Sequence, residues 1–179
     1  MATAPPIRRI LTGHNANGRS CFEQDGASPV QKTVPERPGY RVTNLWRTSP
    51  EGTVRTSDSI VEHQGVLPPA GGTVLRIIEW PAEPQDPAEL RRMMDKTFAV
   101  MYPDAHRNVK EGEHPGMHTT DTVDYAILLE GEIVAIMDEG ETVMRAGDVL
   151  IQRGTAHAWA NRSGKPAKMA FVLVDARPA

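Results

Sequence analysis

Two histidines in the last third of the chain have neighbours that could complete a reactive site. His118 opens an extended stretch, and the side chains of a strand alternate between its two faces, so His118, Thr120 and Asp124 share one face. His157 lies on a second short stretch, where Trp159 has the same parity. Two imidazoles and one carboxylate are a plausible ligand set for a divalent metal. We therefore predict a metal site at His118, Asp124 and His157.

The identity of that metal stays open at this point. Two histidines and one carboxylate with free coordination positions suit non-haem Fe(II). Zn, Mn and Ni accept similar donors, and the order of metal affinities does not choose among them. The predicted cofactor is a divalent metal: Fe, Zn or Mn.

Bulk properties narrow the class of protein. A chain of 179 residues is expected to form one domain, and Cys21, the only cysteine, leaves no intramolecular disulfide. The net charge of −3 and the isoelectric point near 6.1 give no case for nucleic acid. No apolar run reaches membrane-spanning length, and the N-terminus lacks the pattern of a signal peptide. We expect a cytoplasmic protein that binds neither nucleic acid nor membranes.

The stretch Thr73–Trp80 reads as a strong strand before the histidine region. Arg76 shares a face with Val74, Ile78 and Trp80. If that face lines the interior, Arg76 could bind a substrate carboxylate through two hydrogen bonds. The alternative is that Arg76 faces solvent or an internal ion pair. Residues 49–72, just before the strand, read as a surface loop with a solvated His63.

One helix is expected, over residues 87–98. Asp86 is a suitable N-cap, Pro87 suits the first turn, and an acidic residue follows three positions after the cap. Residues 102–115 then form a loop that contains His106 and His114. The role of His106 stays open, whereas His114 could supply a third nitrogen or line the pocket.

The rest of the chain is predicted to be β-structure. Residues 7–11 and 30–34 read as short strands near the N-terminus. Glycine-rich turns divide the C-terminal part into strands at residues 125–129, 133–137, 141–145, 149–152, 156–160 and 168–174. Short strands at this spacing predict an all-β protein with a β-barrel or jelly roll.

Two glycine- and histidine-containing motifs resemble those of the cupin superfamily. In the first motif, Gly112, His118, Asp124 and Gly131 stand at the family spacing. The second motif is matched by Gly147, Gly154, His157 and Asn161. The resemblance covers about the C-terminal third of the chain and implies a small single-domain jelly-roll barrel, with residues 1–72 as an N-terminal strand extension and residues 73–179 as the barrel core.

The chain also departs from the family motifs. Thr120 stands where the family has its second histidine, and Asp124 replaces the family's glutamate. Gln152 takes the place of a proline, and the spacing after Gly147 is one residue shorter. The full ligand set of three histidines and one glutamate is therefore not available from motif positions. The alternative to a metal site is a pocket for an organic ligand, in which His118 and His157 serve as hydrogen-bonding groups.

The resemblance implies a metal-dependent enzyme for a small organic acid or an oxygenated aromatic compound. Lyase, decarboxylase or isomerase chemistry is the first expectation, with an Fe(II) dioxygenase as the alternative. A second alternative is a binding module without metal or turnover. Thr120, Arg76, Trp159 and His114 are the candidate pocket residues. Small members of the family are often homodimers that exchange or pair N-terminal strands, and residues 1–50 are strand-like without an obvious hairpin closure, so a homodimer is expected.

Overall fold

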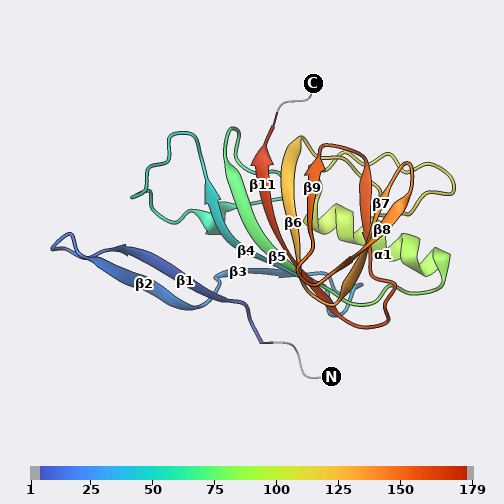
Figure 1. Ribbon diagram of the computed structural model, residues 1–179, viewed down its shortest axis with the longest axis horizontal. Helices are drawn as coiled ribbons and strands as arrows, with labels where there is room; N and C mark the ends of the chain where they lie inside the picture. The colour runs from blue at the N-terminus through green and yellow to red at the C-terminus, as the bar shows by residue number, and fades with distance from the viewer. Residues whose placement is uncertain (1–4, 177–179) are drawn as a thin grey trace.

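A computed structural model describes residues 5–176 of the chain. Its largest element is a six-stranded antiparallel sheet (Figure 1). In spatial order its strands are β3 (Val30–Thr33), β4 (Arg41–Thr48), β5 (Thr73–Trp80), β11 (Ala167–Asp175), β6 (Thr122–Glu130) and β9 (Val149–Arg153). The expected strand at residues 30–34 lies in this sheet, and β4 pairs directly with β5, so part of the N-terminal extension belongs to the main sheet.

A second, three-stranded sheet faces the first. Its order is β10 (His157–Ala160), β7 (Glu132–Met137) and β8 (Glu141–Arg145). His118, which precedes β6 of the large sheet, forms an antiparallel bridge with His157 at the start of β10. The two backbones exchange both N–H···O=C bonds, each 3.0 Å long. The histidine of the first motif is thereby joined to the histidine of the second.

Two strands at the N-terminus form a separate hairpin that projects from the barrel (Figure 1). β1 (Arg8–His14) pairs with β2 (Ser20–Ala27), which the sequence analysis missed. The Asn15 side chain accepts hydrogen bonds from the backbone N–H groups of Asn17 and Arg19, and Gly18 has a φ of 71° in the same turn. This turn closes a local hairpin, so the expectation of an unclosed N-terminal segment was wrong. The predicted homodimer stays a prediction.

The single α-helix, α1 (Pro87–Met101), begins where the capping pattern predicts. The Asp86 side chain accepts a hydrogen bond from the Ala88 N–H at 3.0 Å. The helix ends three residues later than expected, and its buried face includes Met94, Phe98 and Met101. The helix lies against the barrel strands (Figure 1), and its Met94 and Phe98 line the internal cavity.

Residues 49–72 are only partly a surface loop. They contain a short 3₁₀ helix, η1 (Ile60–Glu62), in which Ile60 is fully buried. His63 is 2% exposed, which corrects the expectation of a solvated side chain. The segment was misread because its polar composition hides buried residues, among them Ile60, His63 and Val66.

The large sheet has a regular inward face. In β5, Val74, Arg76, Ile78 and Trp80 are buried while the intervening residues are partly exposed. This alternation places Arg76 in the interior and confirms the predicted parity of the strand. Together with the two facing sheets, it confirms the predicted all-β barrel with one short helix.

One expectation concerns residues at the N-terminal end that the structure does not describe. Residues 1–4, which contributed to the expectation that no signal peptide is present, lie outside the described residues. Within residues 5–176, neither helix combines the length and apolar character that a membrane crossing requires.

Candidate functional site

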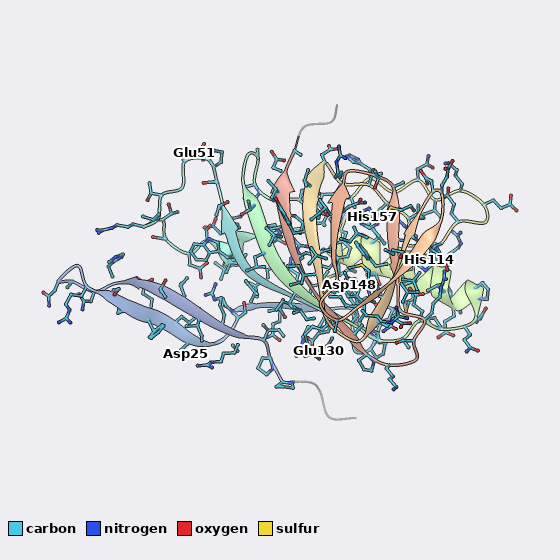
Figure 2. The ribbon with its side chains drawn as sticks, viewed as in Figure 1. Asp25, Glu51, His114, Glu130, Asp148 and His157 are labelled. Atoms are coloured by element: carbon cyan, nitrogen blue, oxygen red, sulfur yellow. The ribbon has the colours of Figure 1, made fainter. Side chains whose placement is uncertain are left out.

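His118 and His157 form one end of an internal cavity. Their ring centroids are 4.3 Å apart, and the ring of Phe98 lies 4.9 Å from that of His118. Trp159 packs edge-on against His157 at 5.6 Å. The two motif histidines are therefore brought together as predicted, inside the barrel, as the position of His157 shows in Figure 2. Trp159 lines the cavity as the sequence predicts.

Backbone carbonyl groups orient both imidazoles. The His118 Nδ1 lies 2.9 Å from the Gly116 carbonyl oxygen, and the His157 Nδ1 lies 3.0 Å from the Thr155 carbonyl oxygen. A carbonyl only accepts, so the His118 Nδ1 carries the proton and its Nε2 keeps a lone pair. The Gln152 side-chain amide also contacts the His157 Nδ1 and donates to the Thr155 carbonyl oxygen at 2.7 Å.

Burial keeps these imidazoles neutral. It lowers the pKa of His118 to about 4, and the carbonyl of Gly116 opposes the shift. Burial also lowers the pKa of His157 to about 3, with a further contribution from neighbouring His118. At neutral pH both rings are uncharged hydrogen-bonding groups.

Asp124 enters the same cavity from strand β6 but has a different environment. It is 4% exposed, and its Oδ1 has no hydrogen-bond partner among the described residues. Burial raises the pKa of Asp124 to about 6, while the Thr122 hydroxyl and the Arg76 guanidinium oppose the rise. The carboxylate is thus mostly ionised at pH 7, with a pKa close enough to neutrality for proton transfer.

Arg76 lies on the floor of the cavity and is 1% exposed. Its Nη2 donates to His63 Nε2 at 2.8 Å and to the Val66 carbonyl oxygen at 3.1 Å. Its Nε and Nη1 have no hydrogen-bond partner among residues 5–176. The alternative orientations, toward solvent or into an ion pair, are excluded for Arg76, and two donors remain free for a ligand.

The loop that holds Arg76 is itself held by a carboxylate. Asp104 accepts hydrogen bonds from the backbone N–H groups of Val66 and Leu67, at 2.9 to 3.0 Å. Burial and the nearby Arg76 lower the pKa of His63 to about 4, so His63 is neutral and its Nε2 can accept from Arg76. The sequence analysis missed His63 because it adjoins no recognisable motif.

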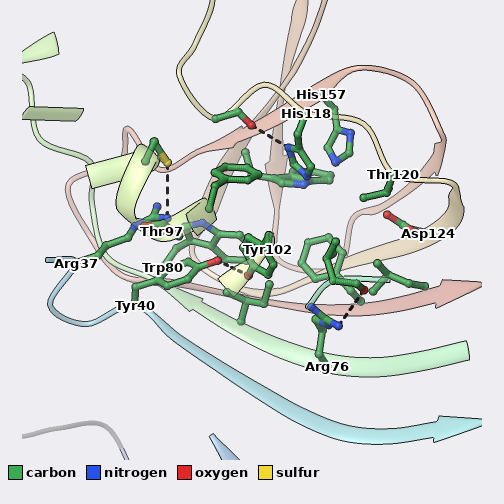
Figure 3. A pocket seen from close by; sticks show the side chains of 18 residues that line it. Arg37, Tyr40, Arg76, Trp80, Thr97, Tyr102, His118, Thr120, Asp124 and His157 are labelled. Atoms are coloured by element: carbon green, nitrogen blue, oxygen red, sulfur yellow. Dashed lines mark hydrogen bonds between the residues drawn. The ribbon is translucent and has the colours of Figure 1, made fainter. Parts of the chain in front are cut away.

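Two tyrosines and a second arginine line another part of the cavity (Figure 3). The hydroxyl oxygens of Tyr40 and Tyr102 are 2.6 Å apart. The Arg37 guanidinium lies over the Tyr40 ring, 4.1 Å from its centroid, and Arg37 is 3% exposed. Arg37 was also missed, because its surroundings, Pro-Glu-Arg-Pro-Gly, read as an exposed turn between strands.

The space open to the centre of a water-sized molecule inside the cavity is about 60 Å³. One water needs about 10 to 15 Å³ by this measure, so the cavity holds a few waters or a small organic molecule. Its lining consists of Arg37, Tyr40, Val66, Arg76, Ile78, Trp80, Met94, Thr97, Phe98, Tyr102, Gly116, His118, Thr120, Asp124, His157, Trp159, Phe171 and Leu173.

Of the other predicted pocket residues, one lines the cavity and one does not. Thr120 lines the cavity, and its hydroxyl is 2.8 Å from that of Thr122. His114 does not line it. The His114 Nδ1 accepts from the Gly116 N–H at 3.1 Å, and its Nε2 faces the Glu83 carboxylate at 3.4 Å. His106 is exposed and lies 3.4 Å from Asp121 at the surface.

The donor set only partly fits the predicted metal. The neutral imidazoles are suitable ligands. Yet no three His, Cys, Asp or Glu side chains within residues 5–176 are grouped closely enough to hold a metal ion. Asp124 lies in the same cavity, but it is Arg76, and neither histidine, that contributes to its pKa. The predicted ligand set of His118, Asp124 and His157 is therefore short of an assembled third ligand.

The chain matches a protein-family model and several known proteins. The family model described as "Cupin domain" matches residues 105–174. The chain is 32% identical to phomopsin biosynthesis cluster protein C' of Diaporthe leptostromiformis, over 98% of this chain and 83% of that protein. It is 29% identical to the cupin-domain-containing oxidoreductase virC of Hypocrea virens, over 98% of this chain and 80% of that protein.

A solved structure is also similar. The Cupin 2 conserved barrel domain protein from Salinispora arenicola CNS-205 matches with a TM-score of 0.40 and 16% identity, over 80% of this chain and 82% of that one.

Proposed function

The chain belongs to the cupin superfamily, and we propose that it is an enzyme that transfers a proton on a small organic acid or oxygenated aromatic substrate, in an isomerase or lyase reaction. Its jelly-roll barrel provides the enclosed cavity. One observation carries the proposal: an unpartnered carboxylate oxygen of Asp124 and two unpartnered N–H donors of Arg76 line the same buried space.

Such a pair complements a substrate with an acidic hydrogen next to a carbonyl or carboxylate group. Asp124 Oδ1, ionised at neutral pH, removes the proton as general base. Electron density then moves onto the substrate oxygen, where one of the two Arg76 donors, Nε–H or Nη1–H, donates to the developing charge. Arg76 remains a guanidinium cation throughout because arginine does not deprotonate in proteins.

The product depends on where the electron pair goes next. Return of the proton from Asp124 to another carbon completes an isomerisation. Expulsion of a leaving group from the neighbouring carbon completes an elimination, which is a lyase reaction. The neutral His118 can accept a hydrogen bond from a substrate hydroxyl group through its Nε2, and Phe98 and Trp159 exclude water around the two imidazoles.

Solvent exchange tests the proposal directly. The purified chain is incubated in D2O with a panel of 2-oxo acids, 3-oxo acids and phenolic acids, and proton NMR follows deuterium uptake and product formation. Asp124→Asn should reduce the rate by about 10²- to 10⁴-fold, the range that a general base contributes. The control Asp121→Asn changes a nearby carboxylate outside the cavity lining and should retain the rate. Equal rates for wild type and Asp124→Asn would overturn the proposal.

A metal-dependent reaction, including oxidation with Fe(II) and O2, is a second candidate. The observation that favours it is the pair of neutral imidazoles on the cavity wall, of which His118 has an Nε2 lone pair. The oxidoreductase name of the virC protein points the same way. Elemental analysis of wild type, His118→Ala and His157→Ala decides between the two. Near-stoichiometric metal in wild type that is lost in both variants would support the metal-dependent reaction in place of the first candidate. Turnover that survives in chelated, metal-free protein would support the first candidate, proton transfer by Asp124.

A further inference from the structure

Arg37 is a second buried cation in the cavity, and the proposed proton transfer does not use it. It lies in the connection between β3 and β4, next to the cavity-facing side of helix α1. Its Nη1 is 3.9 Å from the Met94 sulfur, and its Cζ lies over the Tyr40 ring, 4.1 Å from the centroid. Its Nε and Nη2 have no hydrogen-bond partner among the described residues.

These two free donors have a specific geometry. Nε–H and Nη2–H lie side by side along one edge of a guanidinium, which is the edge that binds a carboxylate through two parallel hydrogen bonds. A buried cation that lacks a partner is unfavourable, and an anionic group of a ligand would supply the missing charge and acceptors. Stacking on Tyr40 explains the orientation of Arg37 but leaves both donors unsatisfied.

Arg76 repeats the same condition at a separate place on the cavity wall. It too is almost fully buried, and its Nε and Nη1, which lie on different edges of the guanidinium, have no hydrogen-bond partner within residues 5–176. In the view of Figure 3, Arg37 and Arg76 lie apart, with Tyr40 and Tyr102 drawn between them. The hydrogen-bonded tyrosine hydroxyls add polar groups to this wall.

The charges of the cavity do not balance without a ligand. The cavity lining holds two guanidinium cations, Arg37 and Arg76, and one carboxylate, Asp124. One anionic group would balance the net charge of this lining, but it would use the unpaired donors of one arginine and leave those of the other unused.

We infer that the cavity binds an organic acid with two anionic oxygen groups, one held by Arg37 and the other by Arg76. This inference names the substrate class of the proposed reaction and rests on that proposed function. The small cavity restricts the acid to a short carbon skeleton.

Calorimetric titration with simple acids tests this inference. Malonate, succinate, glutarate and adipate are each compared with the monocarboxylate of equal carbon number, on the full chain at pH 7.5. Wild type should prefer the dicarboxylate by at least about tenfold at one chain length, and that length reports the spacing of the two guanidinium groups. In Arg37→Met the preference should fall to about threefold or less, with monocarboxylate affinity unchanged.

Arg9→Met is the matched control, because Arg9 is also buried but lies outside the cavity lining and is paired with Gln24, Asp58 and the Leu45 carbonyl. It should keep the dicarboxylate preference. Arg37→Lys keeps the charge without the two adjacent donors and should show an intermediate preference. This second variant keeps the inference testable if Arg37→Met does not fold.

Stability separates a ligand-binding Arg37 from a structural one. Replacement of an uncompensated buried charge by an apolar side chain should leave the melting temperature of ligand-free protein unchanged or raise it. A large drop in melting temperature, a wild type without dicarboxylate preference, or an Arg37→Met protein that retains the preference would each overturn the inference. Dicarboxylate binding without Asp124-dependent exchange would instead overturn the proposed reaction alone.

Discussion

The two ends of the cavity are built on opposite principles. At one end, His118 and His157 are neutral, and backbone carbonyl groups satisfy their Nδ1 atoms. Away from that end, at two separate places on the wall, Arg37 and Arg76 are permanently charged and keep four guanidinium nitrogens without partners among the described residues. The protein itself supplies the hydrogen-bond partners of the two Nδ1 atoms, whereas the guanidinium groups need a ligand to supply theirs.

This difference shows that motif residues and reactive residues need not coincide. The two histidines carry the motif resemblance and join the two sheets through their backbone bridge. The groups with unused bonding capacity come from outside the motifs, in the case of Arg37 and Arg76, or from the substituted motif position Asp124. A search guided only by the motif would place the chemistry at the histidine end.

Removal of Arg76 should reduce turnover strongly. Arg76→Met eliminates the donors to the developing oxyanion, and we expect turnover to fall by about 10²- to 10³-fold. Arg76 also lowers the pKa of Asp124, so the variant should reach its maximal rate at a higher pH than wild type. Rate measurements from pH 5 to 9 test both effects. An unchanged pH midpoint would show that Arg76 and Asp124 act independently.

Acidification should destabilise the histidine end. His118 and His157 have folded-state pKa values of about 4 and 3, below the ordinary 6.5, so unfolded chains take up protons first as the pH falls. Stability is therefore lost from pH 6.5 downward, by about 3 kcal/mol per histidine at pH 4. Urea titrations at successive pH values measure this loss.

Asp124 should oppose that trend. Its raised folded-state pKa means that the folded chain keeps a proton between pH 4 and 6 that the unfolded chain has released, so this group favours the fold as the pH falls through 6. The loss at low pH should accordingly be steeper in Asp124→Asn. A parallel pH dependence in the variant and wild type would contradict the assigned pKa of Asp124.

A smaller effect is expected from the residue that positions Arg76. His63→Ala removes the acceptor for Arg76 Nη2, whereas His63→Gln can restore it through the amide oxygen. We expect kcat/KM to fall by about tenfold in the alanine variant, equivalent to one hydrogen bond, and to recover in the glutamine variant. Equal losses in both variants would indicate that His63 acts only through packing.

The sequence predicted the elements that depend on local patterns. Strand β8 and strand β5 were located to the residue, and the Asp86 cap marked the start of the helix. The face of Arg76 followed from strand parity. Its burial against His63 could not be predicted, because it depends on a loop that Asp104 holds from more than 35 residues away along the chain.

The features of the site that the sequence did not predict also depend on contacts between distant segments of the chain. Correct parity placed Asp124 inside the barrel but did not set its distance from the histidines, which depends on how the segment from His118 to Thr122 crosses between sheets. Arg37 belongs to a turn whose sequence resembles a solvated one. Only packing against Met94 and Tyr40 makes it part of the cavity.

The position of β11 has a consequence for how the molecule forms. Both of its neighbours, β5 and β6, precede it in the chain, and it is the strand that hydrogen-bonds them together. During synthesis, β5, which carries Arg76, and β6, which carries Asp124, each keep one unpaired edge until residues 167–175 leave the ribosome. Pairings of such long sequence separation fold slowly and expose aggregation-prone edges in the meantime. The cavity is therefore among the last features of the barrel to be assembled.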